Sequence, residues 1–213
     1  MKYIIDRSKL RAMDFGFTSD ISAFSLVEKC IINGVGAALT DWKVKLPTHV
    51  FHIIEIEGHL KILEMIPDNN DKGKMKLTLT GIEKYENNGI FGDRVIAIRR
   101  CDYYDDENIR ATANDRCIKK WAENKTNYDI EELLFWTPFA RLFKMKNSPE
   151  KLVCSSELEA TVNANGLTFT DFPLHKNPQG LIAPWDEMKT TYLTDKSCQK
   201  FYRVEEVKDI YLK

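Results

Sequence analysis

The sequence lacks an excess of charge of either sign. Its 213 residues include 31 basic and 32 acidic side chains, so the formal net charge is −1. Proteins that bind nucleic acid use a basic surface to neutralise phosphates, and no half of this chain is markedly basic. The short basic pairs Arg99-Arg100 and Lys119-Lys120 are interpreted as solvated faces. We therefore expect no nucleic-acid partner.

Paired cysteines and zinc motifs are also missing. The cysteines are five in number and widely spaced, at Cys30, Cys101, Cys117, Cys154 and Cys198. None forms a C-x-x-C pair, and the four histidines complete no zinc pattern at the usual spacings. An odd, scattered set of thiols is typical of a reducing compartment. We expect neither a metal site nor an organic cofactor.

Long apolar runs are absent as well. The N-terminal stretch "MKYIIDRSKLRAMDFG" places Asp6 and Arg7 where a secretory signal needs uninterrupted apolar residues. No window reaches 18 uncharged apolar residues, so we expect no membrane span and a cytoplasmic location. No repeat, low-complexity stretch or long linker divides the chain. The sequence therefore predicts a single domain over residues 1–213, long enough to bury about 70% of its unfolded surface.

The segments that are present predict a mixed fold. Strands are predicted in "THVFHIIEIEG", "HLKILEM", "MKLTLTGI", "RVIAIRR" and, near the end, "YRVEEV". Turns are predicted at Glu57-Gly58 and at 87–89. Helices are predicted over Ser19–Gly36, Asn108–Asn124, Asn127–Phe143 and Lys151–Gly166. Strands in the first half and helices mostly in the second predict an α+β domain with an antiparallel sheet.

Cys154, in "KLVCSSELEATVNANG", is the candidate nucleophile. It opens a predicted helix, where free N–H groups and the helix dipole lower the pKa of a thiol, and Lys151 would add to this. The same N–H groups could hold the oxyanion of a tetrahedral intermediate. The alternative is that Cys154 is a buried, inert thiol, because cysteine often packs as a small apolar residue.

A catalytic thiol needs a base, and two histidines lie on the first predicted strand. Strand periodicity places His49 and Phe51 on one face and His52 on the other, so both histidines cannot serve one site. The alternative is that both are core or edge residues hydrogen-bonded to backbone. His59 and His175 are predicted to be surface residues.

A catalytic histidine also needs an acceptor that orients it, and Glu64 is an acid at an apolar strand position. A two-residue loop at Glu57-Gly58 would place Glu64 diagonal to His49 on the same face. A three-residue loop would place it opposite His52, and the sequence favours neither register. Glu55 and Glu57 are rival acceptors that are less well aimed.

The order of His strand, Glu strand and Cys helix resembles the circularly permuted NlpC-type papain-like peptidases and amidases (YiiX-like). Five segments carry the resemblance: "THVFHIIEIEG", "LKILEM", "RVIAIRR", "NYDIEELL" and "KLVCSSEL". A sixth, "GLIAPWDEM", is similar to a tail segment of that family. The resemblance implies a circularly permuted papain-like fold, in which an antiparallel sheet or partial barrel packs against helices. It also implies Cys154 as nucleophile, His49 as base and Glu64 as orienting acid.

The chain departs from the family pattern near the base. The family often opens with a Gly-Asp strand just before the histidine. Here "MDFGFTSD" and a predicted helix intervene, and "ALTDWKV" is the nearest match. Thr48 replaces a serine, while Phe51 and His52 replace small or aliphatic residues. These changes leave the triad in place and leave the substrate open.

The expected function is a thiol-dependent hydrolase, a cysteine peptidase or amidase that acts on a peptide, amide or acyl-ester substrate. One alternative uses the same triad for acyl transfer or lipid-ester hydrolysis, as in lecithin:retinol acyltransferase-like enzymes. Another is a non-catalytic interaction protein that docks through "LLFWTPFARLF". The sequence leaves the oligomeric state undetermined, and it does not decide whether Tyr128, Asp129 or Trp185 lines a cleft.

Overall fold

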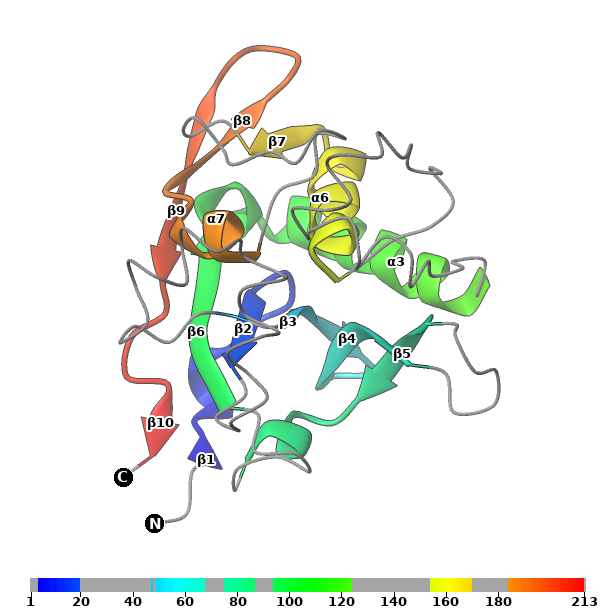
Figure 1. Ribbon diagram of the computed structural model, residues 1–213. Helices are drawn as coiled ribbons and strands as arrows, with labels where there is room; N and C mark the ends of the chain where they lie inside the picture. Colours follow the sequence, from blue (N-terminus) through cyan, green and yellow to red (C-terminus); the bar gives the residue numbers. More distant parts are fainter. Residues whose placement is uncertain are drawn as a thin grey trace, which may run out of the picture.

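The computed structural model describes residues 4–19, 47, 49–67, 75–86, 94–123, 154–169 and 184–212 (Figure 1). Most of this part is built on one antiparallel sheet of eight strands, in the order β5-β4-β3-β2-β6-β9-β8-β7. Along the chain the strands are β2 (Phe15–Ser19), β3 (His49–Ile56), β4 (His59–Pro67), β5 (Met75–Thr80), β6 (Arg94–Cys101), β7 (Leu167–Phe169), β8 (Tyr192–Asp195) and β9 (Phe201–Glu206). This antiparallel sheet, with its helices, confirms the predicted α+β class.

The other elements flank this sheet. The short strands β1 (Ile4–Ile5) and β10 (Tyr211–Leu212) pair with each other and bring the two ends of the described chain together (Figure 1). The helices are α3 (Glu107–Glu123), α6 (Cys154–Ala164) and α7 (Pro184–Lys189), with short 3₁₀ helices η1 (Arg7–Lys9), η2 (Ile82–Tyr85) and η3 (Asp102–Asp105). No helix in the described ranges is both long and apolar enough to cross a membrane.

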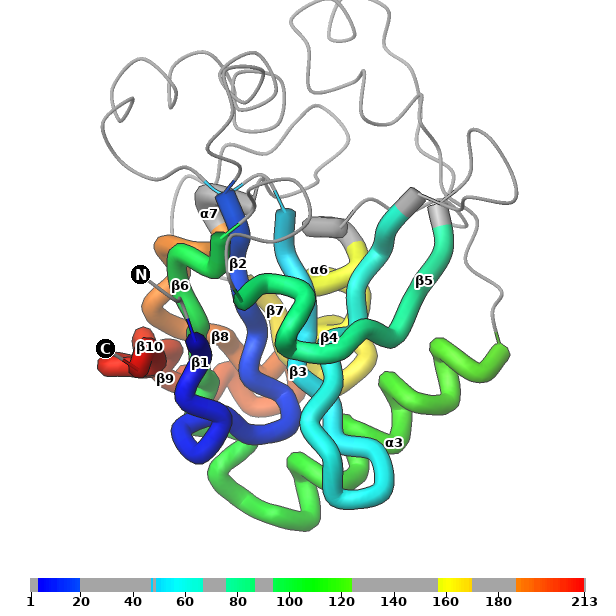
Figure 2. Tube along the Cα trace, turned by 90° about the horizontal axis from the view of Figure 1, so that it is seen from below, coloured from blue at the N-terminus to red at the C-terminus, as the bar shows by residue number. Residues whose placement is uncertain are grey.

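The strands β3 and β4 separate two apolar cores. On one side α3 and α6 contact β3 (Figures 1 and 2). That core includes Val50, Ile54, Leu63 and Met65 of the sheet, Ala113 and Cys117 of α3, and Leu158 and Val162 of α6. The second core contains Phe51, Ile53 and Ile62 with Ile82 and Tyr85 of η2, and it includes Val95 and Ile98 of β6. Successive strand residues point to opposite faces, so both faces of β3 are buried over most of its length.

The β3–β4 hairpin settles the register that the sequence left open. Glu57 and Gly58 both have positive φ, 53° and 75°, as the two central residues of a type I′ turn require. The loop therefore has two residues, and Ile56 pairs with His59 while Phe51 pairs with Glu64. This register places Glu64 diagonal to His49 on the same face of the sheet.

The strand β2 was not predicted, yet it lies in the middle of the sheet between β3 and β6. All five of its residues are buried, so it has no polar-apolar alternation to reveal it. Gly16 pairs with Phe51, and a Cβ atom at Gly16 would overlap the Phe51 ring. Ser19, the first residue of the helix predicted over 19–36, is instead the last residue of β2; the rest of that predicted helix lies outside the described residues.

Other sequence predictions are confirmed in part. The helices predicted at 108–124 and 151–166 correspond to α3 and α6, and α6 is followed by Gly166 at a positive φ of 79°. The predicted C-terminal strand corresponds to β9. The described α-helices all lie in the second half, as expected, but β7 and β8 in that half also join the sheet, beside the predicted β9. The helix predicted at 127–143 and the turn at 87–89 lie outside the described residues.

Two hydrogen-bonded side chains, Asn114 and Arg100, hold neighbouring segments against this sheet. Asn114 of α3 both donates to the Glu55 carbonyl and accepts from the Glu55 N–H, each at 2.8 Å. Arg100, at the end of β6, donates from Nε and Nη2 to the two carboxylate oxygens of Asp14 at 2.8 and 2.7 Å. A bidentate pair of this kind fixes orientation as well as distance. It holds the segment before β2 against β6.

Candidate functional site

His49 and Glu64, two of the three predicted site residues, are hydrogen-bonded to each other. His49 begins β3, and Glu64 lies within β4. The distance from His49 Nε2 to Glu64 Oε2 is 3.0 Å. The Glu64 side chain is fully buried, whereas 19% of the His49 side chain remains exposed. The imidazole is therefore partly accessible to solvent, and its acceptor is not.

Glu64 receives three further hydrogen bonds that the sequence did not predict. Thr80 Oγ1 and Lys84 Nζ donate to Oε1 at 2.5 and 2.7 Å, and Tyr85 Oη donates to Oε2 at 2.5 Å. With His49, each carboxylate oxygen has two donors. A carboxylate offers about four lone-pair directions, so this cluster fills all of them. We call His49, Glu64, Thr80, Lys84 and Tyr85 the Glu64 cluster.

Part of the Glu64 cluster could have been found by extending the register argument. Ile62 of β4 pairs with Thr80 of β5, so Thr80 lies diagonal to Glu64 on the same face. Lys84 and Tyr85 lie on η2, a one-turn 3₁₀ helix. Such a short turn has no periodic pattern that would show which way its side chains point.

The charge of Glu64 follows from these neighbours. Burial alone would raise the pKa of its carboxyl group, but the hydrogen bond and charge of His49, together with Lys84, lower the pKa to about 2. Opposite charges and donated hydrogen bonds both favour the ionised form. Glu64 is therefore a carboxylate throughout the physiological pH range.

The ionised state of Glu64 fixes the tautomer of His49. A carboxylate can only accept hydrogen bonds, so His49 Nε2 must carry the proton that it shares with Oε2. In the neutral imidazole the basic lone pair is then on Nδ1. A proton taken up by His49 goes to Nδ1, the ring nitrogen turned away from Glu64.

Phe51 packs its ring against Tyr85 of the Glu64 cluster. Its ring is stacked on that of Tyr85, with centroids 5.4 Å apart and planes inclined by 10°. The far end of the ring, at Cζ and the two Cε atoms, lies against Gly16. The sequence singled out Phe51 as a departure near the base; the structure shows it as a buried ring stacked on Tyr85.

Cys154 is the first residue of α6, as predicted, and α6 contacts both β3 and β4. The described α6 residues Leu158 and Val162 pack on the Val50 and Ile54 face of β3, opposite to the face of His49 and Glu64. The Cys154 side chain lies outside the described residues. Its pairing with His49 stays a prediction, and so does any contribution from Lys151.

His52 is on the opposite face of β3, as the periodicity predicted. Its side chain is buried, and neither ring nitrogen has a hydrogen-bond partner among the described residues. Burial, with the nearby charge of Lys120, lowers the pKa of His52 to about 3. His52 is thus a neutral core residue. Among the residues that the structure describes, it makes no backbone hydrogen bond of the kind expected under the alternative interpretation.

The helix that begins at Cys154 is anchored by a partly buried ion pair. Lys120 of α3 donates to Glu157 Oε2 of α6 at 2.6 Å, and Thr161 donates to Glu157 Oε1 at 3.1 Å. Glu157 belongs to the "CSSEL" segment that was singled out in the sequence. This acid links the two helices that pack on β3.

The other described cysteines differ from a catalytic thiol. Burial raises the pKa of Cys101 and of Cys117 to about 12, so neither forms a thiolate near neutral pH. Cys198 is exposed. Cys30, His175, Tyr128 and Asp129 lie outside the described residues, as does the side chain of Trp185. His59 is exposed, as predicted, and so are Glu55 and Glu57.

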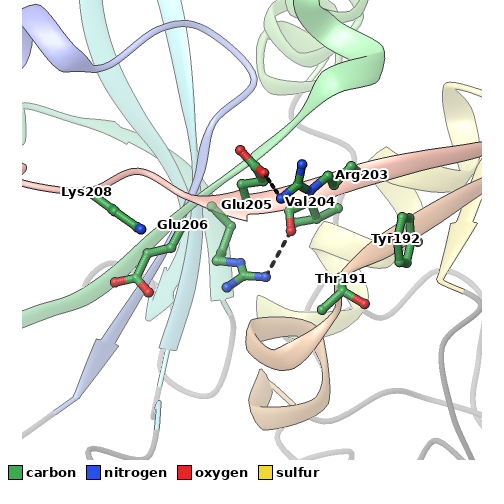
Figure 3. Close-up of a pocket in the computed structure, with 8 residues that line it drawn as sticks. Thr191, Tyr192, Arg203, Val204, Glu205, Glu206 and Lys208 are labelled. Carbon is green, nitrogen blue, oxygen red and sulfur yellow. Dashed lines mark hydrogen bonds and ion pairs between the residues drawn. The ribbon is translucent and has the colours of Figure 1, made fainter.

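A hollow of about 480 Å³ lies elsewhere, between β9 and the chain around β8 (Figure 3). Arg99 at its wall donates to the carbonyls of Thr190 and Val204, and Arg203 pairs with Glu205. Both guanidinium groups are therefore already paired with carbonyl or carboxylate oxygens of the protein itself. None of the Glu64 cluster lines this hollow. Within the described ranges, no group of three or more His, Cys, Asp or Glu residues could hold a metal ion.

No protein-family model matches the chain, and no curated protein matches it at a significant level. The function is therefore inferred from the residues of the site and from their spatial arrangement.

Proposed function

We propose that the protein is a thiol-dependent acyl hydrolase of the peptidase or amidase type, with a circularly permuted papain-like arrangement of its catalytic groups. Cys154 is the nucleophile, His49 the base and Glu64 the orienting acid. The observation that carries this proposal is the His49–Glu64 hydrogen bond on two strands that α6 contacts. A histidine held by a buried carboxylate, next to a helix opened by cysteine, is the constellation that activates a thiol.

The proposed reaction has two steps, acylation of Cys154 and hydrolysis of the resulting thioester. His49 Nδ1 takes the Cys154 proton, the thiolate sulfur bonds to the substrate carbonyl carbon, and the bond to the leaving amine breaks as that nitrogen takes the proton. Water then adds to the thioester, gives a proton to His49 Nδ1, and releases the acid while the thiol is re-formed. The backbone N–H of Cys154 helps to bind the oxyanion in both steps.

Cysteine alkylation followed by peptide mapping tests the nucleophile. We expect iodoacetamide at pH 6 to modify Cys154 at least about tenfold faster than the exposed Cys198, because an unassisted thiol is mostly protonated there. The buried Cys101 and Cys117 should stay unmodified in the folded protein. The His49→Gln variant should lose the Cys154 advantage, and Cys154→Ala should lose the modified peptide.

Equal alkylation rates of Cys154 and Cys198 from pH 5 to 8 would refute the assignment. The Cys198→Ser variant is the matched control, because it removes the exposed reference thiol and leaves the proposed site intact. If Cys154 reacts as expected, mass spectrometry of products from an acyl-ester or amide probe, with and without an amine acceptor, distinguishes hydrolysis from acyl transfer.

A further inference from the structure

Lys84 is held against the carboxylate that orients His49. Its Nζ is 2.7 Å from Glu64 Oε1 and 5.0 Å from the centroid of the Tyr85 ring. The Lys84 side chain is 26% exposed, while that of Glu64 is fully buried. The ammonium group therefore remains close to Glu64 with only part of its own surface in water, where screening of the pair by solvent is reduced.

His49 and Lys84 contact different oxygens of the same carboxylate. His49 is bonded to Oε2 and Lys84 to Oε1. If His49 were protonated, two cations would share one negative charge. A nearby like charge disfavours the charged form of a histidine, whereas an unshared carboxylate would favour it. Lys84 thus offsets part of the stabilisation that the Glu64 carboxylate gives to protonated His49.

We propose that Lys84 is a positioning residue that lowers the proton affinity of His49 through the carboxylate they share. With Lys84 present, Glu64 stabilises the imidazolium less, which favours the neutral imidazole that accepts a proton at Nδ1. Without it, Glu64 would stabilise the imidazolium and block the base. The catalytic meaning of this effect rests on the proposed function, but the effect itself is a property of the resting protein.

The groups around the pair support this assignment. Tyr85 of η2 and Thr80 of β5 are neutral donors, and β2 contributes Thr18 as the strand partner of His49. The two acids of the η2 turn, Glu83 and Glu86, pair with Arg7 of η1. On α6, the proposed function places the Cys154 thiol near His49.

The donors around Glu64 disfavour a second role for it as a base. Four hydrogen bonds stabilise its ionised form, so transfer of the imidazole proton to Oε2 is unfavourable. Glu64 therefore orients His49 and carries charge, and the number of cations on it controls how strongly it attracts a proton to Nδ1.

Titration of His49 followed by imidazole NMR tests the proposal. In Lys84→Met we expect the pKa of His49 to rise by about one unit or more, the usual size of a close-charge effect. Lys84→Arg, which keeps the charge, and Lys76→Met, which removes an exposed lysine of β5, should leave it within a few tenths of a unit. His49→Gln assigns the resonance. Lys84→Gln keeps a donor to Glu64 while removing the charge, and it should give the same rise as Lys84→Met.

An unchanged or lowered His49 pKa in Lys84→Met and Lys84→Gln would overturn the proposal. All titrations are repeated in Cys154→Ala, so that a thiol cannot affect the result. The proposed hydrolase function and the proposed role of Lys84 are then tested independently. A pKa shift without preferential Cys154 alkylation would contradict the proposed function alone, and preferential alkylation without the shift would contradict the role of Lys84 alone.

Discussion

Glu64 shows how a buried acid in an apolar strand is tolerated. Removing a carboxylate from water is costly unless its oxygens are paired, and here four donors pair them. Each donor comes from a different residue, on β3, β5 or η2. The stability of this part of the sheet and the orientation of His49 therefore depend on the same hydrogen bonds.

Replacing Tyr85 with Phe tests one of these bonds. The ring would still stack on Phe51, but Glu64 Oε2 would lose its donor at 2.5 Å. We expect the free energy of unfolding to fall by about 2 kcal/mol, the usual cost of losing a hydrogen bond to a buried charged group. Urea unfolding at pH 7 measures it.

Tyr103→Phe is the matched control for that variant. Tyr103 Oη donates to a neutral backbone carbonyl, that of Asn165, at 3.3 Å, so its loss should cost less than about 1 kcal/mol. Similar losses of stability in the two variants would contradict the importance assigned to the Tyr85–Glu64 bond.

At the scale of residues, the sequence predicted the pair and missed its surroundings. His49 and Glu64 could be found because a polar residue in an apolar strand is conspicuous, and because strand periodicity puts both on one face. Lys84 and Tyr85 could not be found, since a 3₁₀ turn carries no periodic signal. The sequence also could not show that His52 lacks a hydrogen-bond partner among the described residues.

At the scale of elements, the position of η2 depends on a stack of contacts that starts at β2. Gly16 makes room for the Phe51 ring, the ring supports Tyr85, and Tyr85 donates to Glu64. The absence of a side chain at one strand position thus controls the geometry of the Glu64 cluster two strands away.

Gly16→Ala should therefore destabilise the protein. Its Cβ would overlap a ring that is itself buried against Tyr85, and overpacking of this kind costs roughly 1–3 kcal/mol. Gly81→Ala is the control, because its Cβ would meet only the end of the exposed Glu83 side chain, which can move away. Urea midpoints of the two variants should differ clearly.

Shortening Phe51 gives a second check on this contact. In the Gly16→Ala, Phe51→Leu double variant the smaller side chain relieves the overlap. Coupling between the two positions should make the loss of stability smaller than the sum of the two single losses. Strict additivity of the two changes would show that the Gly16–Phe51 contact is not the cause.

The elements themselves were predictable where sequence patterns were strong. β3, β4, β5, β6 and β9 were expected from runs of β-branched and apolar residues, and α3 and α6 from helical composition. β2 was not, because a five-residue strand buried throughout has no alternation. The hairpin register was undecided because it depended on whether Glu57, a non-glycine residue, would adopt a positive φ.

At the scale of the whole molecule, the burial of His52 ties stability to pH. The pKa of His52 is lowered from 6.5 to about 3 in the folded protein. Between these values the unfolded chain binds a proton that the folded protein does not bind. The free energy of unfolding therefore falls as the pH is lowered from 6.5 toward 3, by at most about 1.4 kcal/mol per pH unit. Protonation of Glu64 also lowers the free energy of unfolding, but only below about pH 4.5, the ordinary pKa of the group.

His52→Leu isolates this contribution. The variant should lose most of the decline in urea midpoint between pH 6.5 and 5, and it should be at least as stable as the wild type at low pH, because leucine leaves no buried ring nitrogen unpaired. His59→Gln removes an exposed histidine and should keep the wild-type slope. A slope unchanged in His52→Leu would contradict the assignment.

The pairing of β1 with β10 has a consequence for the order of the chain. Ile4 and Leu212 are strand partners, so a few added residues could join the two ends without disturbing the sheet. New ends opened between α3 and α6 would then give a polypeptide in which the Cys154 helix is made before the His49 strand. Synthesis order could be reversed in this way while the Glu64 cluster keeps every neighbour it has now.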